Sequence, residues 1–216
     1  MGIYSLVAFF QKGGLFMYPI LLVFAFGMAI AIERWIQLNR VRSANRRMWG
    51  EVHPLLAEGQ FDKAREMVDE DKSTIAQMLS MGLARQGAVR RREDIEIAME
   101  ESMMEIIPQL ERRTPYVALL SNIATLLGLL GTIMGLIEAF TAVANANPAE
   151  KADLLSASIS VAMNTTAFGL MAAIPLLILH AKLTSTTGQI VDSLEMASVK
   201  VLNTISNFAK RQFPAS

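Results

Sequence analysis

The sequence predicts an all-α membrane protein with three transmembrane helices and long cytoplasmic helical extensions. Three apolar stretches free of Asp, Glu, Lys and Arg, at residues 15–32, 115–137 and 154–181, are each long enough to cross a bilayer as a helix. Fourteen of the twenty lysines and arginines lie between Arg34 and Arg113, after the first stretch and before the second. Outside the stretches, apolar residues recur every three or four positions, a spacing typical of amphipathic helices.

The basic residues also predict the orientation of the chain. Segments rich in Lys and Arg stay on the cytoplasmic side, so the N-terminus is expected outside and the C-terminus inside. A cleaved signal peptide is the alternative for the first stretch, but its positive charge would precede the apolar region, whereas Glu33 and Arg34 follow it here. The expected segments are a periplasmic N-terminus (1–14), a first span (15–32), a cytoplasmic helical region (33–114), a second span (115–137), a periplasmic loop (138–153), a third span (154–181) and a cytoplasmic C-terminal helix (182–216).

The composition argues against an enzyme. The chain has no cysteine, and His53 and His180 are its two histidines, so no thiolate chemistry and no histidine-built metal site is expected. It also lacks a phosphate-binding loop, a dinucleotide fingerprint and catalytic-triad spacing. We therefore expect no cofactor, no bound metal and no nucleic-acid partner.

Small and polar residues form a stripe along the second apolar stretch. Their spacings alternate between four and three, which places them on one face of a helix. The members of the stripe are Ser121, Thr125, Gly128, Thr132, Gly135 and Ala139. Such a stripe gains nothing from contact with lipid, so it indicates either close helix packing or a water-accessible pathway.

The third stretch carries two such patterns. One consists of Ser156, Ser160 and Asn164, and the other of Ser158, Ala162, Thr165, Gly169 and Ala172. The second pattern is expected to be a packing seam between helices, and the first to line water at the outer mouth. The sequence leaves open which face of this helix lines a pore. Thr166 lies on neither pattern, about 100° from Thr165. The residues expected to pack helices closely are Gly128, Gly131, Gly135, Gly169 and Pro175.

Three groups of motifs, in the same order as the three spans, resemble the MotA/TolQ/ExbB family, and ExbB and TolQ in particular. The first is Gly13-Gly14 with Met17-Tyr18-Pro19-Ile20-Leu21-Leu22 and Ile32-Glu33-Arg34. The second is Leu110-Glu111-Arg112-Arg113 with Leu127-Gly128-Leu129-Leu130-Gly131-Thr132-Ile133-Met134-Gly135, and the third is Thr165-Thr166-Ala167-Phe168-Gly169-Leu170 with Ala172-Ala173-Ile174-Pro175. Together they span most of the chain. Flagellar members have four spans, which makes that branch the poorer match.

This resemblance implies a subunit of an ion-driven motor in the bacterial inner membrane. It implies a homo-oligomeric ring, a pentamer, around a single-span partner of the ExbD/TolR type whose aspartate accepts and releases the ion. Work would pass to envelope machinery through a TonB- or TolA-like protein. Thr132 and Thr166 match the pore-facing threonines of the family, and Thr165, Asn164 and Thr125 complete the expected ion pathway.

One position departs from the family pattern. Many ExbB and TolQ members carry a glutamate five residues before the threonine that Thr166 matches, and Val161 stands there in this chain. Transport through a carboxylate of this subunit's own spans is therefore excluded. Protons carried by water and the partner aspartate are expected, and sodium coordinated by hydroxyl and amide oxygens is the alternative. A passive membrane scaffold is the alternative from a different functional class.

Overall fold

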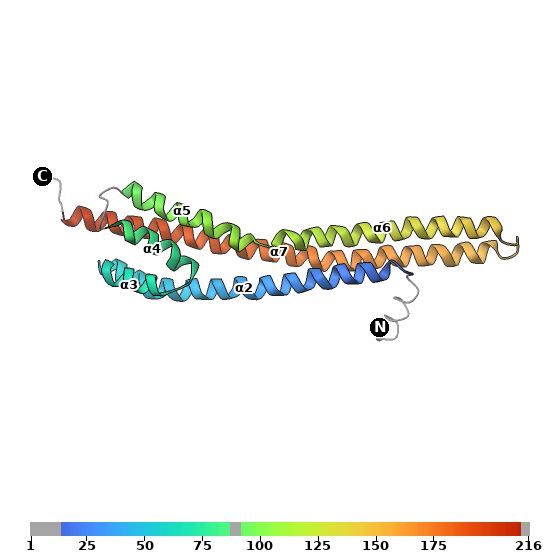
Figure 1. The fold of residues 1–216 in the computed structure, drawn as a ribbon, viewed down its shortest axis with the longest axis horizontal. Coiled ribbons are helices and arrows are strands. Elements are labelled where there is room, and N and C mark those ends of the chain that lie inside the picture. Colours follow the sequence, from blue (N-terminus) through green and yellow to red (C-terminus); the bar gives the residue numbers. More distant parts are fainter. Residues whose placement is uncertain (1–13, 87–91, 213–216) are drawn as a thin grey trace. The chain divides into compact units, whose positions relative to one another are not determined.

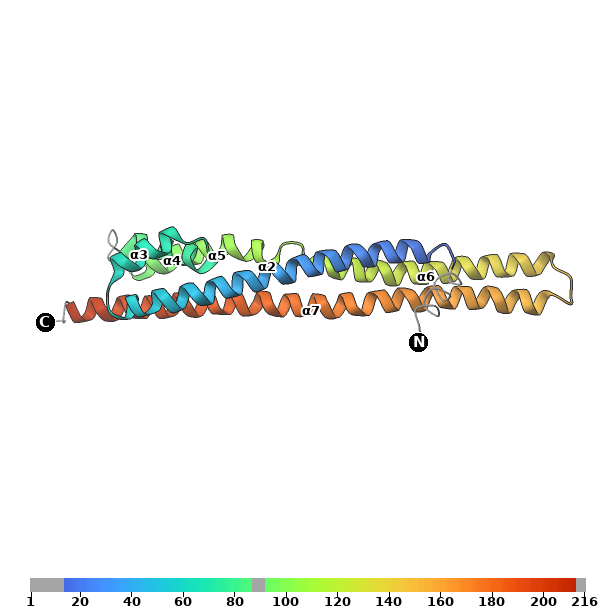
Figure 2. The same ribbon diagram turned by 90° about the horizontal axis from the view of Figure 1, so that it is seen from below.

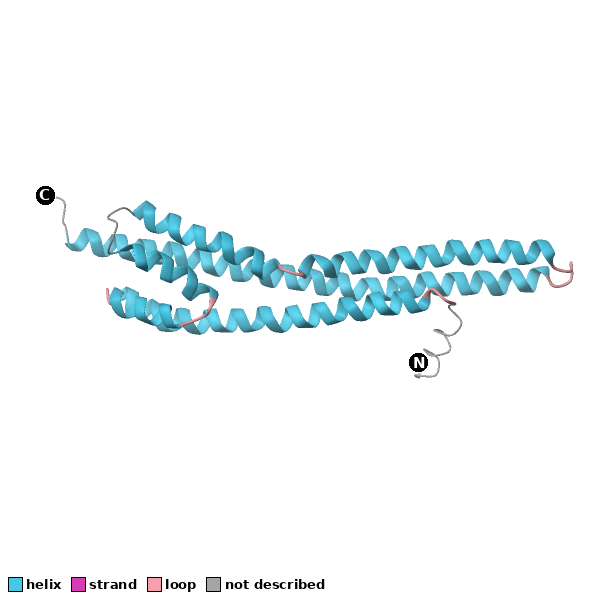
Figure 3. Cartoon of the chain, viewed as in Figure 1, coloured by secondary structure: helices cyan, strands magenta, loops and turns pink. Residues whose placement is uncertain are grey.

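A computed structural model describes residues 14–86 and 92–212, and these residues form helices joined by short loops (Figures 1 and 3). The helices are α2 (Met17–Ala57), α3 (Phe61–Glu70), α4 (Thr74–Gln86), α5 (Arg92–Glu111), α6 (Thr114–Asn145) and α7 (Lys151–Gln212). The described ranges contain no strand. Three helical stretches in them are long and apolar enough to cross a membrane, namely Met17–Ala57, Arg92–Asn145 and Lys151–Ala209. The predicted all-α class with three long apolar helices is confirmed.

The chain divides into two compact units. The first unit comprises Met1–Arg34 and Arg113–Lys182, and the second comprises Trp35–Arg112 and Leu183–Ser216. The helices α2 and α7 contribute residues to both units, whereas α6 belongs to the first and α3, α4 and α5 belong to the second.

Helix ends follow the local sequence. Gly59 adopts a left-handed backbone with φ of +78° directly after α2, and the N–H groups of Gly59 and Gln60 bond to the carbonyls of Leu56 and Leu55. Glycine adopts this conformation without a Cβ clash, which explains why the chain leaves the α2 helix at this point. α4 ends at Gln86, and residues 87–91 lie outside the described residues.

The α5–α6 junction is built differently. Arg113 has a φ of +67°, the one positive φ among the described residues other than glycine. α6 begins at the next residue, and Pro115 lies in its first turn. The N–H groups of a first helical turn have no acceptor within the helix, so proline, which lacks an N–H, loses no hydrogen bond there. Pro108 lies within α5, which continues past it to Glu111.

Alanines make up most of the buried cluster at the centre of the first unit. Ile20, Ala124, Ala172 and Ala173 form a buried cluster to which Val23, Phe24, Leu127 and Phe168 add partly buried surface. Alanine and glycine at an interface let two helix backbones come close. α6 and α7 accordingly run side by side in both views (Figures 1 and 2).

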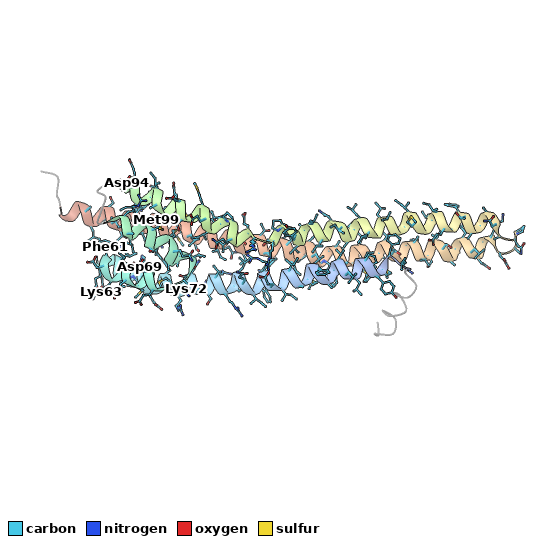
Figure 4. All side chains as sticks on the ribbon, in the orientation of Figure 1. Phe61, Lys63, Asp69, Lys72, Asp94 and Met99 are labelled. Atoms are coloured by element: carbon cyan, nitrogen blue, oxygen red, sulfur yellow. The ribbon has the colours of Figure 1, made fainter. Side chains whose placement is uncertain are left out.

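The second unit buries many aliphatic side chains, Leu79, Met99 and Leu194 among them, and adds polar and aromatic contacts to this core. Asn45 on α2 is buried, and its side chain bonds both to the Thr74 hydroxyl and to the Ile75 N–H at the start of α4. Phe61 of α3 meets Phe208 of α7 edge to face, with ring centroids 5.5 Å apart. Figure 4 labels Phe61 on α3.

Candidate functional site

Four oxygen atoms from α6 and α7 meet in the first unit and form what we call the threonine cluster, namely the Thr132 and Thr166 hydroxyls and the Gly128 and Ala162 carbonyls. The two hydroxyls are in hydrogen-bonding contact with each other. The Thr132 hydroxyl also lies 3.2 Å from the Gly128 carbonyl and 3.1 Å from the Ala162 carbonyl, and the Thr166 hydroxyl lies 3.2 Å from the Gly128 carbonyl. Both threonine side chains are half-buried. The structure thus brings together the two residues that the sequence singled out on separate helices.

Glycines at the contact between α6 and α7 allow the Thr132 and Thr166 hydroxyls to come together. A Cβ added to Gly169 would lie 2.8 Å from the Ala124 carbonyl oxygen and 2.9 Å from the Gly128 Cα. A Cβ on Gly135 would lie 2.9 Å from the Ala162 Cβ. Real Cβ atoms do not approach other atoms so closely, so the backbones of α6 and α7 come this near only because glycine occupies these positions.

Two other predicted pathway residues, Thr165 and Thr125, bond to the backbone of their own helices. The Thr165 side chain is buried, donates to the Val161 carbonyl at 3.1 Å and packs its methyl group against Gly131. The Thr125 side chain is exposed, and its hydroxyl bonds back to the Ser121 carbonyl at 3.2 Å within the same helix. Asn164 is half-buried. Of the predicted pathway, Thr132 and Thr166 therefore share one polar site.

Two contacts between α6 and the segment that contains α2 serve as reference points for the height of the cluster along the helices, and each defines one level. At one level Glu33 and Arg113 form an ion pair with 3.5 Å between their charged atoms. At the other level the Phe16 Cβ lies 3.1 Å from where a Cβ on Gly131 would stand. At 1.5 Å per helical residue, these levels are about 26 Å apart along α2 and about 27 Å along α6, close to the roughly 30 Å of a bilayer core. Thr132 follows Gly131, so the cluster lies at the level farther from the ion pair.

The position that departs from the family pattern also lies at this far level. One methyl carbon of Val161 lies 3.3 Å from where a Cβ on Gly14 would stand, and Gly14 itself has a φ of +77°. An apolar side chain at position 161 therefore packs near the start of α2.

The chemistry available in the cluster is that of neutral oxygen. The helical segments around it carry no carboxylate, and no group of three or more His, Cys, Asp or Glu side chains among the described residues is arranged to hold a metal ion. Hydroxyl and carbonyl oxygens can solvate a cation or a carboxyl group without changing their own charge. The cluster can therefore stabilise a charge supplied by a partner or by a passing ion.

Sequence reasoning missed the backbone share of this site. The Gly128 and Ala162 carbonyls leave no signature in the residue types, because every residue carries a carbonyl and only the packing of the two helices brings the threonine hydroxyls to these two. Ser121 was identified as part of the stripe, but its role as a bridge was not. Its fully buried hydroxyl donates to the Ala173 carbonyl of α7 at 2.8 Å, a second polar link between the two helices.

Comparison with known proteins finds one matching family and relatives that carry the names of its members. Residues 70–196 match the MotA/TolQ/ExbB proton channel family. An ExbB homologue of Methanothermobacter thermautotrophicus, named as a biopolymer transport protein, is 26% identical over 194 residues, which cover 89% of this chain and 67% of the relative. An ExbB-like biopolymer transport protein of Synechocystis is 29% identical over 189 residues, covering 85% of this chain and 72% of the relative.

A third relative is similar over a shorter region. The Tol-Pal system protein TolQ of Haemophilus influenzae is 35% identical over 86 residues, covering 40% of this chain and 37% of TolQ. The family match covers more than half of the chain and includes both threonines and the glycines that pack them. The chain belongs to the MotA/TolQ/ExbB proton channel family.

Proposed function

We propose that this protein is a subunit of an ion-driven motor of the ExbB/TolQ type that converts an ion gradient into mechanical work on envelope machinery. The observation that carries this proposal is the meeting of Thr132 and Thr166 in one polar cluster between two otherwise apolar helices. The names of its relatives, which refer to biopolymer transport and to the Tol-Pal system, support the same reading. The role is one of transport and not of enzymatic catalysis.

In this proposal, the ion-accepting group belongs to a partner. A single-span protein of the ExbD/TolR type places an aspartate beside the threonine cluster. A carboxylate in a low-dielectric site is costly unless nearby hydroxyls solvate it, and its pKa rises when they do not. The Thr132 and Thr166 hydroxyls donate to the charged aspartate and accept from its protonated form, while neither threonine titrates.

Protons are the proposed coupling ion, and sodium is a second candidate with a specific observation behind it. The four oxygens of the cluster belong to the ligand class that hard cations prefer. The position of the family glutamate is occupied by Val161, which removes one candidate proton carrier.

The proposal also includes the membrane location, the orientation and the assembly of the chain. The chain is placed in a bacterial inner membrane with its N-terminus periplasmic and its C-terminus cytoplasmic, since the basic residues between the first two spans stay inside. Copies of the chain form a ring, a pentamer, around the single-span partner. The ring drives a TonB- or TolA-like protein.

Ion flux in proteoliposomes that contain this protein and its single-span partner tests the proposal. A pH gradient and a sodium gradient are imposed separately. Thr132→Val and Thr166→Val keep side-chain shape and remove the hydroxyl, and each is expected to lower flux at least about tenfold, which corresponds to roughly 1.4 kcal/mol of lost stabilisation. Thr132→Ser, which restores a hydroxyl, is expected to recover most of the flux.

The matched control is Thr141→Val. The Thr141 hydroxyl lies on the same helix, is exposed and bonds back to the Ile137 carbonyl at 2.9 Å, outside the cluster. Flux that follows the pH gradient supports proton coupling, and flux that requires sodium supports the second candidate. Flux that survives in both cluster variants would exclude the threonine cluster from the ion pathway, and assembly of the parent complex without any ion flux would leave a passive scaffold as the better description.

A further inference from the structure

One face of α2 in the second unit combines basic and aromatic side chains. Successive spacings of four, three and four residues place its members on the same side of the helix. We call it the basic face, and its members are Arg42, Arg46, Trp49 and His53. The two arginines and His53 are exposed, and the half-buried Trp49 ring has its centroid 4.9 Å from that of His53. Neither arginine forms an ion pair with any residue that the structure describes.

One face of α5 has the opposite charge. The same spacings of four, three and four residues align its members, which are Glu93, Ile97, Glu100 and Met104. We call it the acidic face. Both glutamates are exposed and form no ion pair within the described ranges, while Ile97 is 59% and Met104 72% exposed. A helix face that presents unpaired charge together with large apolar side chains is a candidate surface for a partner protein.

The two faces match each other when their helices run antiparallel. The spacings four, three and four read the same in both directions, so one antiparallel register brings every member of one face opposite a member of the other. The facing pairs are Arg42 with Met104, Arg46 with Glu100, Trp49 with Ile97, and His53 with Glu93. Two pairs join a basic group to a carboxylate, one joins an aromatic ring to an aliphatic side chain, and in the fourth an arginine stem covers a methionine.

The geometry of a ring supplies this antiparallel register. Within the second unit α2 and α5 run in opposite directions (Figure 1). Copies related by rotation about the membrane normal keep equivalent residues at the same height, and the ion pair between Glu33 and Arg113 gives a common reference. Arg42 follows Glu33 by nine residues, and Met104 precedes Arg113 by nine. The other three facing pairs are equally balanced about this ion pair, so rotation without a shift along the axis aligns them.

We propose that the basic face of one copy of this chain binds the acidic face of the next copy. Both faces are exposed on a single chain, and each is complementary to the other and not to itself. A contact between two different faces joins subunits head to tail, which closes into a ring and does not give a two-fold dimer. This inference rests on the ring in the proposed function and names the surfaces that close it.

Disulfide crosslinking in membranes of expressing cells tests the contact. The chain has no cysteine, so introduced thiols report without background from the chain itself. Oxidation of Trp49→Cys combined with Ile97→Cys is expected to give a ladder of linked oligomers, because every copy then carries one thiol on each face. Each single variant is expected to stay unlinked. The matched control is Glu51→Cys combined with Ile97→Cys, since Glu51 is exposed on α2 about 160° around the helix from Trp49.

A charge swap in the same crosslinking background separates contact from misfolding. Arg46→Glu and Glu100→Arg should each lower the yield of linked oligomers at least about tenfold, because like charges then face each other. Combining the two restores opposite charges and should restore the ladder. Arg40→Glu makes the same change of charge on another side of α2, where the residue is also exposed, and should leave the yield unchanged.

Three results would overturn the proposal. They are equal crosslinking through Glu51→Cys, a disulfide that leaves the chain monomeric, and a charge swap that does not restore the ladder. The proposed function fails by a different result, namely flux that persists without the Thr132 and Thr166 hydroxyls, so the two failures are distinguishable.

Discussion

Gly128 and Gly169 meet backbone to backbone, and a Cβ on Gly128 would lie 3.2 Å from the Gly169 Cα. The two residues set the separation of α6 and α7, and that separation brings the Thr132 and Thr166 hydroxyls together. The polar site therefore depends on the absence of side chains one helical turn away from Thr132.

Gly169→Ala should force the helices apart. The added methyl group meets the backbone at Ala124 and Gly128, which cannot rotate away as a flexible side chain can, and overpacking of this kind costs about 1–3 kcal/mol. The expected result is a lower thermal midpoint of the detergent-solubilised protein. Gly188→Ala on the same helix is the control, since nothing lies within 4 Å of its added Cβ, and it should stabilise by about 0.5–1 kcal/mol through helix propensity. Equal losses in both variants would refute the packing argument.

Asn45→Ala should destabilise the second unit. The Asn45 side chain accepts the Ile75 N–H at 3.2 Å, and without it a buried donor at the start of α4 is left unpaired, at a cost of about 1–3 kcal/mol. Chemical denaturation followed by circular dichroism measures the change. Asn39→Ala, on the exposed side of α2, should change the unfolding free energy by no more than about 0.5 kcal/mol, and a similar loss there would argue against a capping role.

Asp71 should make stability depend on pH in the acid range. Hydrogen bonds from Ser73, and then the charge of Arg47, hold the pKa of this carboxyl below its usual 3.8, although partial burial opposes them. A carboxyl with a lowered folded-state pKa contributes stability above its unfolded pKa and loses it as pH falls through the folded value. The difference in unfolding free energy between the parent and Asp71→Asn should therefore be largest near neutral pH and shrink below pH 3.8. A difference that stays constant down to low pH would contradict this assignment.

Arg113 should respond differently to glycine and to alanine. Its left-handed backbone costs an ordinary residue about 1–2 kcal/mol, and glycine avoids this cost. The exposed ion pair with Glu33 is worth no more than about 1 kcal/mol. Arg113→Gly should therefore be neutral or slightly stabilising, while Arg113→Ala loses the pair, keeps the strain and should be destabilising. Thermal midpoints that do not differ between the two variants would show that the left-handed backbone of Arg113 does not lower the stability of the protein.

The helical class and the three apolar stretches could be predicted because they depend on local composition. The position of Thr166 could not, since periodicity placed it on neither stripe of its helix, about 100° from Thr165. Its contact with Thr132 arises from how two particular helices meet at Gly128 and Gly169, which the pattern of a single helix does not encode.

Contacts between separate helices of the second unit were missed for a similar reason. The pairing of Asn45 with the start of α4 joins positions about 30 residues apart. Long-range pairings of this kind need the tertiary structure.

The threonine cluster has more acceptors than protons. Two hydroxyl hydrogens face the Gly128 and Ala162 carbonyls and each other's oxygen, so more than one arrangement of donors satisfies the same heavy-atom positions. Rotation about two C–O bonds interconverts these arrangements while both helix backbones stay fixed. The pair is thus a small reorientable dipole, and it can turn its lone pairs or its hydrogens toward a charge as that charge arrives and leaves.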